Sequence, residues 1–197
     1  MPFGVALRRF GATFLVVTAF GACCVAWFCR ALSLVWPPLM PVTCVGRVAG
    51  GMLMFVLDSR LQQDCLVLGD FPLCRLLLMN DARYPWFILV PRREEVSEIF
   101  QLDAADQAQL WRETTMLAEV LKDSFAADKM NVAALGNVVG QLHMHVIVRK
   151  RQDPAWPAPV WGHSPAQVYT AEQVAAVLER LRLVLTDDFR FGDGVSV

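Results

Sequence analysis

The amino-acid sequence predicts an α+β domain in which an antiparallel sheet of about four to five strands is packed by two helices. Three observations lead to this fold class. Short apolar runs bounded by turn residues indicate strands. Two longer segments repeat their apolar residues at helical spacing. The links between neighbouring runs are too short for the crossovers that parallel strands need, so the strands are expected to pair antiparallel.

The first two strands are expected to form a hairpin. They are the apolar run 74–80 and the run 86–90, which combines aromatic and β-branched residues. The link 81–85 ends in Pro85, which favours an extended Tyr84 and therefore a turn. A link this short predicts direct antiparallel pairing of the two runs.

A helix is expected after this hairpin. Asp103 is a suitable N-cap, and Asp106 adds negative charge in the first turn. Apolar side chains then recur on one face of the helix: Leu110, Trp111, Leu117, Val120 and Leu121.

The second half of the domain predicts two more strands and a closing helix. The strands are the runs 131–135 and 142–148, and the glycine-containing segment 136–140 connects them. Thr170 and Gln173 have the spacing of a capping box. The helix that follows is expected to bury Val174, Val177, Leu178, Leu181 and Leu185.

Composition divides the chain into two unlike parts. Hydrophobic residues make up 55% of the chain and charged residues 19%, which excludes intrinsic disorder. Residues 1–53 contain four basic residues and no acidic ones, whereas residues 54–197 contain 14 basic and 19 acidic residues. The resulting net charge of −5 on the second part disfavours binding to nucleic acid. We therefore divide the chain into an apolar leader, residues 1–53, and a domain, residues 54–197.

The leader has three interpretations. Residues 10–29 are uncharged, and twenty residues are long enough to span a bilayer core of roughly 30 Å. A cleaved signal peptide is the second interpretation, although the apolar core of such a peptide usually has about 7–15 residues. In the third, translation starts at Met52, and the residues before it are an upstream stretch read in frame.

Cysteine usage favours a reducing compartment. Four of the six cysteines lie in the leader, and Cys65 and Cys74 belong to no C-x-x-C pair. These two are expected to be small buried hydrophobic residues. The domain is accordingly expected in the cytoplasm, or at a membrane if residues 10–29 form an anchor.

Polar and apolar residues alternate strictly from residue 141 onward. Because a strand has a two-residue period, Gln141, His143 and His145 should project from one face of the sheet. This spacing alone leaves three interpretations open. They are a solvated sheet face, a metal site completed by a third ligand, and covalent catalysis in which a neutral imidazole attacks phosphorus. The residues between them should enter the core: Leu142, Met144 and Val146.

The stretch 135–147 resembles the signature of the histidine triad (HIT) family, in which three histidines are separated by single apolar residues. Residues 78–80 and 86–92 resemble that family's opening hairpin, and residues 156–162 resemble the tail of a bacterial branch whose motif begins with Gln. The resemblance covers roughly residues 54–165. It implies a HIT-like sheet fold.

The resemblance also implies an activity, namely hydrolysis or transfer of nucleoside monophosphates. The substrates it implies are dinucleoside polyphosphates or nucleoside phosphoramidates. By position, His143 matches the family's nucleophile, His145 its third histidine, and Asn137 a residue that contacts the substrate phosphate. Gly140 would offer a backbone amide to the same phosphate, and Asn80 falls near a position used for nucleoside contact. The resemblance requires no metal or organic cofactor, and it implies a homodimer with a nucleotide substrate as its partner.

Gln141 stands where the family has its first histidine. A carboxamide donates and accepts hydrogen bonds but does not pass a proton at neutral pH. Two alternatives to an active enzyme therefore stay open: a nucleotide-binding module with weak turnover, and a metalloprotein that uses His143 and His145.

Further residues carry narrower expectations. The basic residues 149–151 would attract an anionic substrate locally. Trp156 and Trp161 lie in a proline-rich loop that would stack on a base, line a dimer contact or cover the domain's own core. His163 and the charge run 92–95 are expected at the solvated surface.

Overall fold

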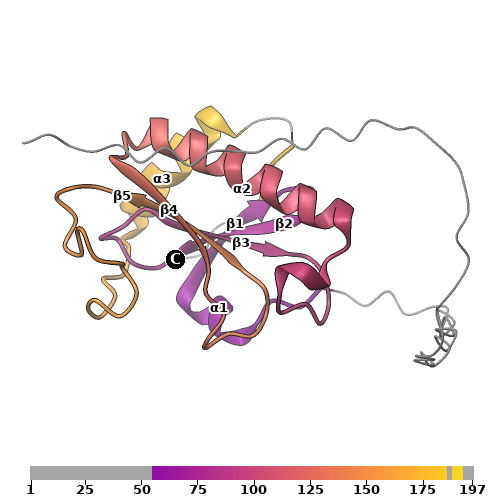
Figure 1. The fold of residues 1–197 in the computed structure, drawn as a ribbon. Coiled ribbons are helices and arrows are strands. Elements are labelled where there is room, and N and C mark those ends of the chain that lie inside the picture. The colour runs from indigo at the N-terminus through magenta and orange to yellow at the C-terminus, as the bar shows by residue number, and fades with distance from the viewer. Residues whose placement is uncertain (1–54, 186–187, 193–197) are drawn as a thin grey trace, which may run out of the picture. The chain divides into compact units, whose positions relative to one another are not determined.

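The computed structural model describes residues 55–185 and 188–192, and Figure 1 shows their arrangement. The sheet has six strands in the order β4-β5-β3-β2-β1-β6, and every strand pair is antiparallel. The predicted α+β class with an antiparallel sheet is confirmed. In chain order the elements are α1 (Ser59–Asp64), β1 (Cys65–Asp70), β2 (Cys74–Met79), β3 (Trp86–Pro91), a 3-10 turn (Ile99–Gln101), α2 (Ala104–Ser124), β4 (Lys129–Ala134), β5 (Met144–Arg149), α3 (Ala171–Val184) and β6 (Arg190–Phe191).

The predicted hairpin is β2 paired with β3, from Cys74 opposite Pro91 to Leu78 opposite Phe87. Strand β5 then lies between β3 and β4. It begins at Met144, so residue 143 lies immediately before the strand rather than within it.

Besides the 3-10 turn, one helix and two strands were not predicted from the sequence. Helix α1 has six residues, too few for a helical period to appear. In β1 the register shifts between Val67 and Gly69, which interrupts the two-residue alternation. Strand β6 has only two residues and forms through its pairing with β1.

The two faces of the sheet carry separate apolar clusters. Figure 1 shows α2 and α3 on one side of the sheet and α1 on the other. The core under α2 and α3 includes the residues expected there: Leu110, Leu117, Leu121, Leu142, Met144, Val146, Val174, Val177 and Leu181. The opposite cluster combines Leu57 and Leu61 near α1 with Ile88 and Ile147 of the sheet and with Val160 from the proline-rich loop.

The predicted helix caps are confirmed. The Asp103 side chain accepts a hydrogen bond from the N–H of Asp106, and Thr170 and Gln173 form the capping box of α3. The prediction that Trp111 is a core residue is wrong, because its side chain is 47% exposed. Adjacent helical residues differ by about 100° in direction, so Trp111 turns away from the face that Leu110 buries.

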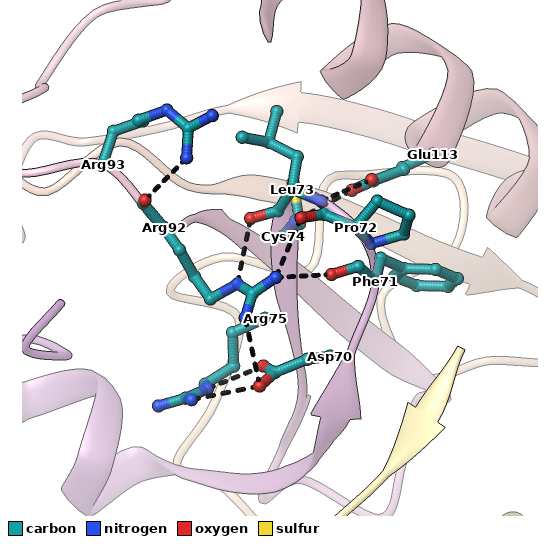
Figure 2. Close-up of polar contacts among 9 residues, drawn as sticks. All are labelled: Asp70, Phe71, Pro72, Leu73, Cys74, Arg75, Arg92, Arg93 and Glu113. Carbon is teal, nitrogen blue, oxygen red and sulfur yellow. Dashed lines mark hydrogen bonds and ion pairs between the residues drawn. The ribbon is translucent and has the colours of Figure 1, made fainter. Parts of the chain in front are cut away.

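The corner before β2 is held by a carboxylate from α2, as Figure 2 shows. Glu113 is buried, and its two oxygens accept hydrogen bonds at 2.9 Å from the N–H groups of Leu73 and Cys74. Burial, followed by the nearby Glu113 carboxylate, raises the pKa of the Cys74 thiol, and burial raises that of Cys65 to about 12. Both cysteines are buried and free, as predicted.

The backbone carbonyl groups of the same corner accept hydrogen bonds from the side chain of Arg92 (Figure 2). The guanidinium donates at 2.8 Å to the carbonyl oxygens of Phe71 and Pro72 and at 3.3 Å to that of Leu73. The expectation that all of 92–95 is solvated surface is therefore wrong for Arg92, which is half-buried, and it holds for the other three residues.

Candidate active site

A cavity of about 350 Å³ lies on the sheet face that α1 covers. Its walls are mostly aliphatic and aromatic, with charged side chains from α1. Neither helix α1 nor the cavity was predicted from the sequence. The lining residues are Arg60, Leu61, Asp64, Met79, Trp86, Ile88, Leu135, Asn137, Val138, Val139, His143, His145, Trp161 and Gly162.

The ring of His143 is held by the backbone of its own motif. Its Nδ1 atom lies 2.7 Å from the carbonyl oxygen of Gln141. Because a carbonyl oxygen only accepts hydrogen bonds, Nδ1 carries the proton of the neutral ring, which puts the lone pair on Nε2. The side chain is 5% exposed and lines the cavity. His143 therefore has the tautomer that an attacking imidazole needs.

The ring of His145 is held in the opposite tautomer. The indole Nε1–H of Trp86 donates to His145 Nδ1 at 2.9 Å, and an indole can only donate. The proton of His145 is thus on Nε2. Burial, followed by the neighbouring His143, lowers the pKa of His145 to about 3, although a hydrogen bond to the backbone of Leu135 opposes this shift. His145 is therefore a neutral ring at physiological pH.

The two imidazoles are direct neighbours. Their ring centroids are 4.8 Å apart and their planes are nearly perpendicular. Trp161 packs edge-on against His145, with ring centroids 5.3 Å apart, and against Trp86, at 5.6 Å. Of the roles left open for Trp161, the structure shows that it covers the domain's own second core and at the same time lines the cavity.

Gln141 is placed differently from the two histidines. The described lining of the cavity does not include it. Its Oε1 atom accepts a hydrogen bond from the N–H of Asp58, and its Nε2 atom donates to the carbonyl oxygen of Val56, both at 2.9 Å. Its carboxamide is therefore occupied by the chain segment that leads into α1.

Asn137 and His143 also line a second, smaller cavity of about 220 Å³. Asn137 is exposed, so its carboxamide is accessible from solvent. The walls of this cavity are more polar than those of the first, and Gly140 belongs to them. The full lining is Ser97, Glu98, Ala134, Gly136, Asn137, Gly140, Leu142 and His143.

Asn80 lies apart from both cavities in the described residues. Its side-chain oxygen accepts a hydrogen bond at 2.9 Å from the N–H of Tyr169. Asn80 thus ties the segment before α3 to the end of β2, which is a structural role that its position in the motif did not suggest.

Arg149 does not supply the local positive potential that was expected of it. Its side chain is 2% exposed and forms an ion pair with Asp153 at 2.8 Å. It also donates to the side-chain oxygen of Asn131 and the carbonyl of Ala158. A guanidinium with these partners is structural. The basic side chain that lines the larger cavity is Arg60.

Exposure and packing test two of the remaining predictions for the proline-rich loop. His163 is exposed, as expected. The guanidinium carbon of Arg149 lies 5.6 Å from the ring centroid of Trp156, so Trp156 packs on this side chain rather than at the cavity. The described residues contain no group of three His, Cys, Asp or Glu side chains that could hold a metal ion.

No described helix is long and apolar enough to cross a membrane. The apolar stretch 10–29, the three interpretations of the leader and the Met52 start all fall outside the described residues.

Comparison with known proteins assigns this chain to a family. The model of the HIT domain matches residues 60–152. A histidine triad protein from Sinorhizobium meliloti is 46% identical, with a TM-score of 0.66, and the match covers 68% of this chain and all of that one. A histidine triad protein from Marinobacter aquaeolei is 51% identical, with a TM-score of 0.66, and the match covers 67% of this chain and 96% of that one.

A third similar structure is the histidine triad protein of Bradyrhizobium japonicum, which is 44% identical with a TM-score of 0.65. That match covers 66% of this chain and 98% of the other. No curated protein matches this chain. Because related chains of 44–51% identity are covered almost completely, the chain belongs to the histidine triad (HIT) family.

Proposed function

We propose that this protein is a nucleotidyl hydrolase or transferase in which His143 is the nucleophile. The substrates are dinucleoside polyphosphates or nucleoside phosphoramidates, from which it cleaves a nucleoside monophosphate. One observation carries the proposal. The hydrogen bond between His143 Nδ1 and the Gln141 carbonyl leaves the lone pair on Nε2, in a side chain that borders both cavities.

The reaction proceeds in two displacements at phosphorus. In the first, Nε2 of His143 forms a bond to phosphorus while the bond from phosphorus to the leaving oxygen or nitrogen breaks. The imidazole becomes a cation that keeps its Nδ1 proton, and the Gln141 carbonyl stabilises that charge. In the second, water attacks phosphorus, the bond to Nε2 breaks, and the water proton passes to solvent.

Hydrogen-bond donors are needed for the charge that develops on the phosphoryl oxygens. Asn137 and the backbone amide of Gly140 border the smaller cavity beside His143. His145 does not act as an acid, because its pKa of about 3 keeps it uncharged, and its Nε2–H is already bonded to the backbone of Leu135. The leaving group therefore takes its proton from water.

The two cavities suggest how a substrate is oriented. The larger cavity, with aliphatic and aromatic walls, suits a nucleoside, and Arg60 and Asp64 offer polar contacts. His143 and Asn137 border both cavities, so we assign the reacting phosphorus to the point where they meet. The smaller cavity then receives the leaving group, next to Ser97 and Glu98.

Single-turnover labelling tests the proposal. The full-length chain is incubated with a nucleoside phosphoramidate that carries a labelled phosphoryl group, and it is quenched in denaturant at alkaline pH, where a phosphorus–nitrogen bond to histidine survives. We expect an acid-labile nucleotidyl adduct, which His143→Ala abolishes. His163→Ala is the matched control, because this exposed histidine lies in neither cavity lining. Equal labelling of the His143→Ala chain would refute the assignment.

The two alternatives predict other results. A nucleotide-binding module with weak turnover binds nucleoside monophosphate but accumulates no adduct. A metalloprotein that uses His143 and His145 contains stoichiometric zinc or iron after purification, which elemental analysis measures.

Two further properties stay predictions. The family resemblance implies a homodimer, and light scattering of the purified chain measures its mass in solution. Cysteine usage favours the cytoplasm, and cell fractionation decides between that location and attachment to a membrane through residues 10–29.

A further inference from the structure

The carboxamide of Gln141 bridges two backbone groups of one short segment. It accepts from the N–H of Asp58 and donates to the carbonyl of Val56, each at 2.9 Å. The partners are more than 80 positions apart in the sequence, and both polar ends of the side chain are used. The side chain therefore extends across to the 56–58 segment and binds it much as a neighbouring strand would.

This segment sets the position of α1. Leu57, between the two bonded residues, is buried against the sheet. Asp58 is the N-cap of α1, and its side chain accepts a hydrogen bond from the N–H of Arg60. A six-residue helix is too short to be stable alone, so its place depends on such contacts.

Helix α1 in turn forms one wall of the proposed nucleoside cavity. Its residues Arg60, Leu61 and Asp64 line that cavity together with the two histidines. Gln141 thus connects the start of the histidine motif to the opposite wall of the site, although the cavity lining does not include it.

The chemistry of the residue fits this bridge. A carboxamide presents a donor and an acceptor side by side at one end. The two nitrogens of a neutral imidazole point in diverging directions, so a histidine at this position would meet one backbone group and leave the other unpaired. Gln141, in place of the first histidine of the family motif, is therefore better suited to position α1 than a histidine would be.

We propose that Gln141 is a positioning residue for the nucleotide, which docks the 56–58 segment so that α1 completes the nucleoside cavity, and that it takes no part in proton transfer. The proposal rests on the proposed function for the identity of the ligand. It predicts that loss of the bridge weakens nucleotide binding while the reaction of bound substrate continues.

The first experiment uses two variants of the full-length chain. Gln141→Met keeps the length of the side chain and removes both hydrogen bonds, and Gln141→His restores the family motif. We expect each to raise KM and the Kd for nucleoside monophosphate by about tenfold, as the loss of hydrogen bonds of this kind predicts, with kcat within about twofold. Hydrogen exchange in the peptide that spans 56–64 should accelerate in parallel.

A second pair of variants approaches the bridge from its other end. Asp58 has φ −55, which proline can adopt, so Asp58→Pro removes the N–H that donates to Gln141. Asp58→Ala is its control, since it removes the same capping carboxylate but keeps that N–H. We expect Asp58→Pro to raise KM further than Asp58→Ala, and this difference should vanish when Gln141 is already Met.

Two results would overturn the proposal. A rise in kcat for Gln141→His would mean that residue 141 takes part in proton transfer. Unchanged exchange and unchanged nucleotide affinity in Gln141→Met would mean that the bridge does not position α1. A wild-type chain that binds nucleotide but forms no adduct would contradict the proposed function alone, because exchange and affinity still decide the role of Gln141.

Discussion

Burial of His145 predicts a specific acid sensitivity of the fold. Its pKa is about 3 in the folded chain against an ordinary value of 6.5. Between these two pH values the unfolded chain binds a proton that the folded chain does not. The stabilisation is therefore complete above pH 6.5 and is lost progressively as the pH falls toward about 3.

The size of the effect follows from this difference in pKa. Within the window, each pH unit changes the free energy of unfolding by about 1.4 kcal/mol for one proton. Between pH 7.5 and 4.5, His145 should therefore cost roughly 2.5 kcal/mol of stability. Burial acts to raise the pKa values of Asp81 and Asp153, but hydrogen bonds from Arg83 and Arg149 lower them overall. The stability that these two carboxylates give the fold is therefore lost only below roughly pH 4.5.

Denaturant unfolding at the two pH values measures this loss. In His145→Asn the side chain cannot titrate, so we expect lower stability at pH 7.5 but a pH dependence smaller by roughly 2.5 kcal/mol. His163→Asn, at an exposed position, should keep the wild-type dependence. If His145→Asn loses as much stability on acidification as the wild type, the burial of a neutral His145 is not the source of the acid sensitivity.

Three further substitutions test the scaffold, two by denaturant unfolding and one by hydrogen exchange. Glu113→Gln replaces one of two accepting oxygens with a donor that faces a backbone N–H, and it should lower the free energy of unfolding by about 2–3 kcal/mol; a loss below about 0.5 kcal/mol would contradict this. Gly69→Ala would bring a Cβ to 2.2 Å from the Arg190 carbonyl oxygen, so β6 should detach from β1. Hydrogen exchange of the residues in β6 should then become faster, and unchanged exchange would argue against the β1–β6 pairing. Asp153→Asn leaves the buried Arg149 guanidinium without its counter-charge and should cost about 3–5 kcal/mol, whereas a neutral effect would mean that Arg149 has access to water.

Local patterns in the sequence determined a large part of this structure. The β2–β3 hairpin, the caps at Asp103 and Thr170, and the alternation after residue 141 each depend on residues a few positions apart. Turn chemistry, capping and the two-residue period are short-range effects, so the sequence states them directly. The histidine motif is equally local, which is why the family could be expected before the fold was known.

Only the tertiary structure decided what the side chains of the site contact. The Trp86–His145 and Gln141–Asp58 hydrogen bonds join residues 59 and 83 positions apart, and Arg149 is buried by an ion pair that its basic neighbours gave no reason to expect. Such contacts depend on how strands and loops meet in space, which no periodicity encodes. The tautomer of each imidazole and the wall formed by α1 follow from those contacts, because a hydrogen-bond partner, not the identity of a residue, determines where a proton resides.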